Sequence, residues 1–419
     1  MASEDIIVFL DIVENTVNMV RGDGSEKKTL FTTGCVCPDG IGLDLSAYNT
    51  SNNPHDIVVW WGNMGAMKPC PEEKDGADWH DADGFLVRAP LFGNNSAVEL
   101  VEVTAPRHLI RSMATYHAPG HLPLITTVKQ VAVSSDGCAV FFCDREGHCV
   151  KKYNVKTKEV VPLLSLDTLA ALANGMSEEE AYASPVEPNS DEDKCRFCVG
   201  IALDEAHNLI FFTVKGPSKG GQGCILGAPY YYKRRHLPSV IAAKTSASEG
   251  VIDPATVVTL LDHLTEPIDL LLDSKENYLY WTARGDAEEG GSSLNRAPVT
   301  YDPRSGKPHL GEMELFLGGF NEPIGLAWAA SLESCMDLPE SFKGTLRQYM
   351  YVTDRGHLWR CNMEKRTKEI IYECGSKNVL TGVGVLRIRP EEEKTEEKSE
   401  NGCAGQVYTE KTPSPCRCK

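Results

Sequence analysis

Four segments of the sequence each place one basic residue directly after a short apolar run, and these residues are the first candidates for chemistry. They are Arg145 in CDREGH, Lys215 in TVKGPS, Arg284 in TARGD and Arg355 in TDRGH. Ammonium and guanidinium groups donate strong, charge-assisted hydrogen bonds to anionic oxygens. If the fold brings the four positions together, the sequence predicts a site for an anionic or enolate-bearing small molecule.

Other residues could complete such a site. His357 and Glu322 are candidate proton-transfer groups, and His80 and His148 are further loop imidazoles of the same kind. Aromatic and amide side chains could hold the rest of an organic ligand. The residues expected to do this are Trp60, Trp61, Asn63, Phe197 and Asn321.

The four cations also have a purely structural interpretation. Like charges that are held close together repel one another unless something neutralises them. Each cation could therefore pair with a carboxylate of its own or of a neighbouring segment. The nearest acids along the chain are Asp144, Asp286 and Asp354.

The elements that must position these residues repeat along the chain. Units that begin at Lys129, Cys198, Glu266 and Glu322 share one order: an apolar run, a polar turn, a second β-like run, a loop with glycine and two further β-like runs. Repeated units of four short strands are typical of a β-propeller. In that fold the loops between second and third strands open on one face, so the four cations are expected to form part of a ring around the channel mouth.

Two further units complete the count. The segment that starts at DGIGLDL supplies four strands, whereas the N-terminus supplies only three. The run LTGVGVLRI at 380–388 can serve as the missing inner strand. The sequence thus predicts an all-β, six-bladed propeller over 1–390, closed by a blade shared between the termini. We also expect a helical or loop insertion at 167–192 and a charged tail at 391–419.

Composition narrows the partners. The chain has 42 basic and 59 acidic residues, a formal net charge of −17, which argues against nucleic acid and anionic membranes. No apolar stretch approaches the length of a membrane helix, and the start MASEDIIVFL lacks the basic region of a signal peptide. We expect a cytoplasmic protein in which most of the 15 cysteines are free thiols.

Several chemistries have no motif in the sequence. There is no Walker loop, no GxSxG and no HExxH. The pair Cys195 and Cys198 has CxxC spacing, but no second such pair accompanies it. The sequence therefore predicts no cofactor and no bound metal.

The segment NYLYWTARG resembles the YWTD repeat of six-bladed propellers, with Ala283 in place of the aspartate. The layout is similar to YWTD, NHL and strictosidine-synthase or lactonase-type propellers. It also loosely resembles the fungal propellers that act as hetero-Diels–Alderases in tropolone–sesquiterpenoid biosynthesis. That resemblance implies a cofactor-independent enzyme that dehydrates a hydroxymethyl tropolone to a quinone methide and adds it to a terpene alkene.

The resemblance implies roles for the candidate residues. Arg355 and Arg284 would hold the acidic tropolone, assisted by Lys215 or Arg145, and His357 or Glu322 would deliver the proton. Walls for the apolar alkene would come from Trp60, Trp61 and Phe197.

Two other functions stay open. A lactonase-like hydrolase would need one divalent ion, bound by a shell drawn from Glu14, Asn63, Asn321 or Glu322. A non-catalytic ligand-binding or scaffold propeller would need no chemistry at all.

Overall fold

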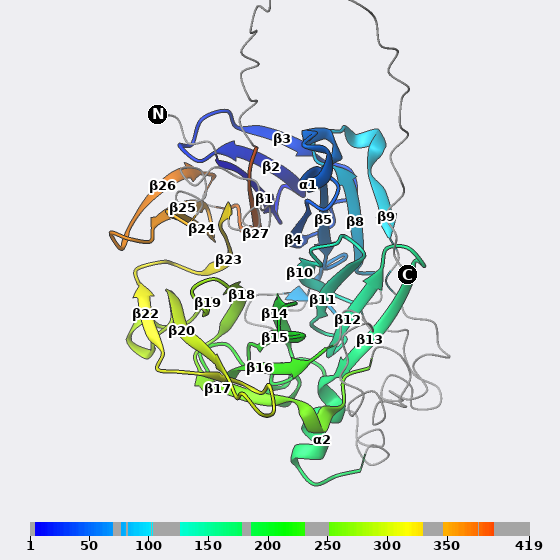
Figure 1. Cartoon of the computed structure of the whole chain (residues 1–419), viewed down its shortest axis with the longest axis vertical. Helices are drawn as coiled ribbons and strands as arrows, with labels where there is room; N and C mark the ends of the chain where they lie inside the picture. Colours follow the sequence, from blue (N-terminus) through cyan, green and yellow to red (C-terminus); the bar gives the residue numbers. More distant parts are fainter. Residues whose placement is uncertain are drawn as a thin grey trace, which may run out of the picture.

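The computed structural model describes residues 5–69, 77–80, 83–101, 103, 126–177, 186–230, 251–329, 347–375 and 377–388. These segments form six main sheets, arranged as blades around a common axis (Figure 1). The predicted all-β, six-bladed propeller is therefore confirmed, and the described helices are few and short. The predicted charged tail at 391–419 lies outside the described residues.

Blades I to III run from the axis outward as follows. Blade I contains β27 (Leu380–Arg387), β1 (Asp5–Asp11), β2 (Thr16–Arg21) and β3 (Lys28–Phe31). Blade II contains β4 (Pro38–Asp44), β5 (Val58–Asn63), β8 (Phe85–Pro90) and β9 (Glu99–Val101), with a small ribbon of β6 (Lys68–Pro69) and β7 (Ala77–Asp78) in its loop. Blade III contains β10 (Val128–Val133), β11 (Ala139–Asp144), β12 (Cys149–Asn154) and β13 (Glu159–Ser165).

Blades IV to VI complete the ring. Blade IV contains β14 (Cys198–Asp204), β15 (Leu209–Val214), β16 (Gly223–Pro229) and β17 (Val258–Leu264). Blade V contains β18 (Pro267–Asp273), β19 (Tyr278–Ala283), β20 (Ser293–Tyr301) and β22 (Glu314–Leu317), and β21 (Pro308–Leu310) also pairs with β20. Blade VI contains β23 (Pro323–Ala327), β24 (Tyr349–Asp354), β25 (His357–Asn362) and β26 (Thr367–Glu373).

Blade I joins the two ends of the described chain. Strand β27 pairs antiparallel with β1, from Asp5 opposite Arg387 to Asp11 opposite Leu380. The buried Asp5 carboxylate accepts hydrogen bonds from Arg387 Nε at 2.7 Å and from the Tyr351 hydroxyl of blade VI at 2.8 Å. The predicted closure is confirmed, because this pairing covers an edge of β1 that would otherwise be open.

Every inner strand has a β-bulge at the same place. The pairing with the second strand shifts between the first and fourth residues of β4, β10, β14, β18, β23 and β27. Glycine occupies the third position in four of these strands, at Gly40, Gly200, Gly325 and Gly382. A Cβ atom on Gly200 would lie 2.1 Å from the Ile268 carbonyl oxygen of the next blade, so only glycine allows the inner strands to approach so closely.

Threonine hydroxyls join these bulges from blade to blade. Thr213 Oγ1 accepts a hydrogen bond from the Gly200 N–H at 2.7 Å and donates one to the Ile268 carbonyl of blade V, also at 2.7 Å. Thr282 donates to blade VI at 2.6 Å, and Thr353 donates to blade I. Each of these threonines lies within two residues of the cation that ends its segment, so the cations follow a rigid part of the structure.

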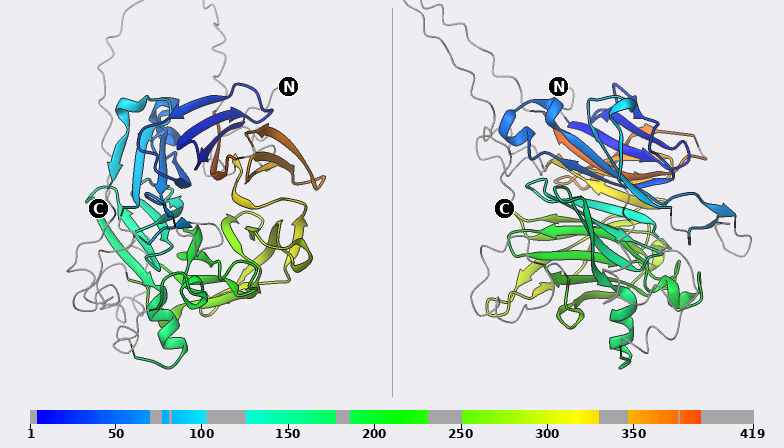
Figure 2. Two further views of the ribbon diagram at one scale, coloured as in Figure 1. Left: turned by 180° about the vertical axis from the view of Figure 1, so that it is seen from behind. Right: turned by 90° about the vertical axis from the view of Figure 1, so that its right-hand side faces the viewer.

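The cores lie between neighbouring blades. Consecutive residues of a second strand face opposite blades, so Tyr280 packs in the core between blades V and VI and Trp281 in the core between blades IV and V. Trp60 and Trp61 divide in the same way between blades II–III and blades I–II. The two views in Figure 2 show the blades packed face to face around the axis.

The predicted insertion is helical in part. Helix α2 (Leu166–Ala173) begins at Ser165, whose hydroxyl accepts a hydrogen bond from the Thr168 N–H at 3.2 Å. A second short helix, α4 (Asp191–Lys194), directly precedes blade IV, and α1 (Tyr48–Ser51) lies in blade II. Residues 178–185 of the insertion lie outside the described part of the chain. No described helix is long and apolar enough to cross a membrane.

The closure of the ring generates the first prediction. Deletion of residues after Pro390 should change the free energy of unfolding by less than about 0.5 kcal/mol, the usual range for surface changes. Deletion of residues after Lys377 removes β27 and should abolish the cooperative transition. Urea unfolding followed by tryptophan fluorescence measures both. A shorter chain that still unfolds in one transition at the wild-type midpoint would show that β27 does not close the ring.

Candidate functional site

The predicted cations occupy equivalent positions at one end of the blades. Each lies just after a second strand, and in three blades its backbone N–H donates to the residue that precedes the inner strand. These bonds are Arg145 to Thr127 at 3.1 Å, Lys215 to Phe197 at 3.0 Å and Arg284 to Glu266 at 2.9 Å. Arg355 follows β24 at the same point, and its carbonyl accepts from Leu380 at 2.7 Å. The loop face of the propeller therefore carries one cation from each of blades III to VI.

Glutamates alternate with the cations along blades IV to VI. Glu266 Oε1 lies 3.0 Å from Lys215 Nζ and 3.9 Å from Arg284 Nη1. Glu322 lies 3.4 Å from Arg284 Nη2 and 3.1 Å from Arg355 Nη2. We call these five residues the charged arc.

The acids named from the sequence have other partners. Asp354 accepts backbone N–H bonds from Asn321 and Glu322, the closer at 2.6 Å. Lys151 Nζ donates to Asp144 Oδ2 at 2.5 Å, and Asp286 pairs with Lys219 at the same distance. The cations are therefore paired with carboxylates, as the structural interpretation expects, but with different ones. Lys215, Arg284 and Arg355 pair with the glutamates that precede inner strands, and Arg145 pairs with Glu146.

The cations are close enough to oppose one another. Burial lowers the pKa of Lys215, and although Glu266 acts against this, Arg145 and Arg284 lower the pKa further. The half-buried Arg145 pairs with the buried Glu146, and its guanidinium carbon lies 5.3 Å from the centre of the Phe197 ring. Arg145 therefore extends the cationic edge of the charged arc to blade III.

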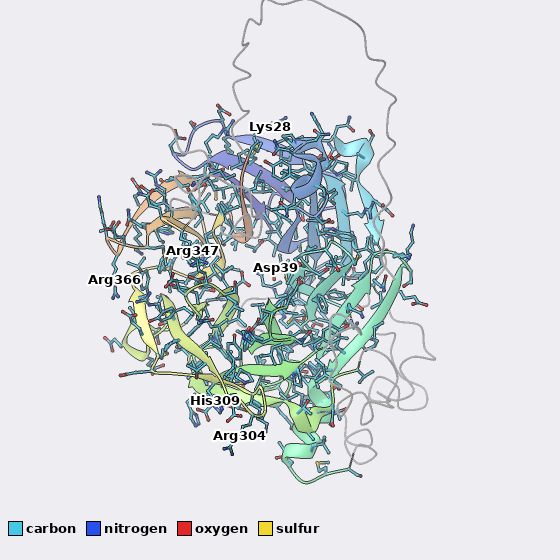
Figure 3. All side chains as sticks on the ribbon, viewed as in Figure 1. Lys28, Asp39, Arg304, His309, Arg347 and Arg366 are labelled. Carbon is cyan, nitrogen blue, oxygen red and sulfur yellow. The ribbon has the colours of Figure 1, made fainter. Side chains whose placement is uncertain are left out.

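A lysine–aspartate pair lies at the axis beside Arg145. Asp39 and Lys129 are the second residues of β4 and β10, within the bulges, and Asp39 Oδ2 lies 2.5 Å from Lys129 Nζ. Figure 3 shows Asp39 near the centre of the ring. Burial lowers the pKa of Lys129 to about 8, and the charge of Arg145 contributes.

The other side of the axis is apolar. Val199, Ile268 and Ile324, the equivalent residues of blades IV, V and VI, pack in one cluster with Val379 at its edge. Asp269 follows Ile268 in β18. Its two carboxylate oxygens accept hydrogen bonds from the backbone N–H groups of Leu270 at 2.9 Å and Leu326 at 3.2 Å. Burial raises the pKa of Asp269 to about 8, with a smaller contribution from the charge of Asp39.

Two histidines meet on one carboxylate beside the mouth. His80 Nε2 and His148 Nε2 lie 3.1 and 2.9 Å from the two oxygens of Asp193, which is in helix α4. Their Nδ1 atoms lie 2.7 Å from Asp78 and 3.0 Å from Asp167. We call these five residues the histidine clamp, because it joins loops of blades II and III to the insertion before blade IV.

His148 is the charged member of the histidine clamp at neutral pH. Burial opposes its protonation, but Asp167 and Asp193 outweigh this effect and raise its pKa to about 10. The pKa of His80 is also raised, by Asp193 and Asp78, against the effect of burial. The two histidines in turn keep the pKa of Asp193 well below its usual range, although that side chain is buried.

Three predicted ligand-binding residues lie elsewhere. Trp60 and Trp61 are 1% and 0% exposed in the cores between blades, so neither offers a face to a ligand. Asn63 is fully buried, and its side chain bonds the backbone of Val36 at 2.7 Å and of Gly34 at 3.1 Å. At the axis itself, Val199, Ile268 and Ile324 pack against one another and are also buried.

The proton-transfer candidates are separated. His357 Nε2 lies 3.7 Å from Glu373 and its ring lies beside Trp359, whereas Glu322 lies in the charged arc. Asn321 bonds Asp354 through its backbone N–H, and Phe197 packs between Arg145 and His148.

The proposed metal shell is not assembled in the described part of the chain. No group of three or more His, Cys, Asp or Glu side chains is arranged there to hold a metal ion. The amide of Asn63 is bonded to backbone groups, and Glu322 contacts two guanidinium groups.

Nine of the described cysteines are free thiols: Cys35, Cys37, Cys143, Cys149, Cys195, Cys198, Cys224, Cys361 and Cys374. Cys138 is bonded in a disulfide.

The fold and this site define the protein as a six-bladed propeller with a charged loop face. No protein-family model matches the chain. A Pyricularia oryzae protein named low-density lipoprotein receptor-related protein 1 is 26% identical over 370 residues, which are 87% of this chain and 90% of that protein. A Cochliobolus heterostrophus protein named 3-hydroxyacyl-CoA dehydrogenase-like protein LAM1 is 28% identical over 355 residues. That match covers 83% of this chain and 55% of LAM1, so the chain spans about half the length of this relative.

Two solved structures are similar in outline. The structure titled Nidogen/Laminin Complex has a TM-score of 0.49 and 10% identity, and covers 91% of this chain and 98% of its own. The Pseudomonas aeruginosa periplasmic gluconolactonase PpgL has a TM-score of 0.42 and 12% identity, and covers 92% of this chain and 99% of its own.

The histidine clamp generates a prediction about pH. A basic group whose pKa is higher in the folded than in the unfolded state stabilises the folded protein. This stabilisation is complete at pH values below the unfolded-state pKa, and it is lost as the pH rises through the folded-state pKa. His148→Gln should therefore lower the free energy of unfolding by about 3–5 kcal/mol at pH 6, as expected when a buried pair loses one partner. The loss should shrink towards pH 10, the folded pKa of His148.

Urea unfolding at pH 6, 8 and 10 measures this difference between variant and wild type. His263→Gln is the matched control. That side chain is 87% exposed, so its replacement should leave the free energy of unfolding unchanged at every pH. An effect of His148→Gln that is the same at pH 6 and pH 10 would mean that the clamp does not depend on the imidazolium charge.

Proposed function

We propose that the protein is a cofactor-independent enzyme that binds a small anionic organic molecule at the channel mouth on its loop face. The observation that carries this proposal is the convergence of Lys129, Arg145, Lys215 and Arg284 from three successive blades, in which Arg145 lowers the pKa of both lysines. Carboxylates pair with these cations, namely Asp39, Glu146, Glu266 and Glu322, and a ligand anion would be a further acceptor for donors that still oppose one another.

A surface pocket of about 290 Å³ lies between the loops of blades IV and V. It is lined by Lys219, Gly220, Gly221, His263, Thr265 and Glu289. None of these residues belongs to the charged arc, and His263 comes from β17, the outermost strand of blade IV. The pocket is linked to the charged arc through the Ser218 hydroxyl, which lies 3.3 Å from Glu266.

The reaction that we propose is dehydration of a hydroxymethyl tropolone, followed by hetero-Diels–Alder addition to a terpene alkene. A tropolone is acidic, and its paired oxygens match the fork of Arg284 or Arg355. Cycloaddition needs no covalent catalyst, because alignment of two reactants can lower a barrier by about 7–11 kcal/mol.

Both curated relatives reported above come from fungi, which supports a place in fungal metabolism. No observation at the axis favours the metal-dependent lactonase. The non-catalytic alternative shares the ligand site and differs only in turnover.

Tropolone binding tests the proposed site. Arg355→Ala should weaken binding about 10- to 100-fold, since a hydrogen bond to a charged group contributes about 1.5–3 kcal/mol. Arg355 is 47% exposed, so its replacement should leave the fold intact, and Arg355→Lys should restore little because the guanidinium fork is lost. Isothermal titration calorimetry at low salt provides the affinities.

Arg304→Ala is the matched control, because Arg304 lies on an exposed turn at the periphery of the ring (Figure 3). Equal tropolone affinity in wild type and Arg355→Ala would make the charged arc structural. Conversion of 3-hydroxymethyltropolone with humulene, followed by mass spectrometry, separates the enzyme from a binding protein. Loss of that conversion on chelation would favour the metal-dependent alternative.

A further inference from the structure

Lys129 lies at the axis, and its side chain is 9% exposed. Its ammonium contacts Asp39 Oδ2 at 2.5 Å and the Met64 sulfur at 2.8 Å. Met64 follows β5 at the position that corresponds to Arg145 in blade III, so the side chain of Lys129 reaches from its strand towards the loop face. Thioether sulfur is only a weak acceptor. Among the described residues, no third acceptor contacts the ammonium.

The groups around Lys129 make its proton easy to release. Burial is the main reason for its lowered pKa, and Arg145 adds to the effect, whereas Asp39 and Glu146 act against it. The Cys37 thiol is the remaining titratable neighbour. A general acid is most effective when its pKa is close to the working pH, and about 8 meets that condition.

The other candidate acids are less suitable. His357 contacts Glu373 and Trp359 rather than the charged arc. Glu322 already contacts two guanidinium groups, those of Arg284 and Arg355. His80 and His148 have both ring nitrogens engaged by carboxylates.

We propose that Lys129 donates the proton to the leaving oxygen of the ligand bound at the channel mouth, with Asp39 holding the amine in place. This inference rests on the proposed function, since it needs a ligand anion at the mouth. It assigns the proton transfer to a residue on an inner strand, whereas the sequence alone favoured His357 or Glu322.

The step balances without a cofactor. The electron pair of the anionic ring oxygen forms a C=O bond, and the ring bonds shift towards the methylene carbon. The bond from that carbon to the hydroxyl oxygen breaks, and its electron pair stays on the oxygen. That oxygen takes a proton from the Lys129 ammonium. The products are a neutral quinone methide, water and a neutral amine, which solvent protonates again.

Lys129→Arg tests this role, because guanidinium keeps the charge but does not release its proton near neutral pH. The assay follows 3-hydroxymethyltropolone with ethyl vinyl ether as the trapping alkene, from pH 6 to pH 9.5. Wild type should lose turnover above about pH 8. The arginine variant should bind tropolone within about threefold of wild type, and its turnover should fall about 100-fold without a pH step near 8.

Two further variants guard against a folding defect. Lys129→Met combined with Asp39→Asn removes the pair without leaving a buried charge, and it should match the arginine variant in turnover. Lys151→Arg alters another buried lysine–aspartate pair of blade III and should retain turnover.

The outcomes separate the two proposals. If wild type neither binds tropolone nor forms the adduct, the proposed function fails and this inference fails with it. If wild type forms the adduct and Lys129→Arg does so at the same rate with the same pH profile, only the role of Lys129 is overturned. An equal loss of turnover in Lys151→Arg would also overturn it, because the effect would then be structural.

Discussion

The hydrogen bonds of the inter-blade threonines are the constraint on which the rest of the structure depends. The Thr213 hydroxyl bonds two inner strands at once. It accepts a hydrogen bond from the Gly200 N–H of its own blade and donates one to the Ile268 carbonyl of the next blade. The hydroxyl reaches both partners only if the inner strands approach closely, which glycine at the bulge allows. The backbone at the cation just beyond each threonine is therefore held in place. As a result, the cations of the charged arc repeat from blade to blade at equivalent positions.

That symmetry also determines how charge is distributed on the loop face. Glu266 and Glu322 precede their inner strands by one residue, so each lies between the cation of its own blade and that of the preceding blade. Partly exposed ion pairs stabilise a protein little on their own. Their main effect here is to hold guanidinium and ammonium groups in defined directions around the axis, which is the preorganisation that an anionic ligand needs.

Much of the fold could be predicted because its signals are local and periodic. The strand runs, the turns and the incomplete N-terminal blade indicated six blades and their closure, and the repeated basic residue located the cations. The partners of those cations could not be predicted, because they depend on which blade lies next to which. Trp60 and Trp61 were misplaced since both faces of a second strand pack against neighbouring blades. The histidine clamp joins residues from distant loops. His80 and His148 were recognised as loop imidazoles, but nothing in the sequence indicated that they share Asp193.

The buried ionisable groups at the axis follow from where the stability of a propeller resides. The large apolar cores lie between blades, where aromatic pairs such as Phe31 and Trp61 stack at 5.5 Å. The axis contributes little apolar area, so the fold tolerates groups there whose charged forms are disfavoured. Lys129 and Asp269 are both of this kind, and burial moves both pKa values to about 8 from opposite directions. The inner strands thus hold an acid and a base whose pKa values both lie near 8, while the cores between the blades keep the fold intact.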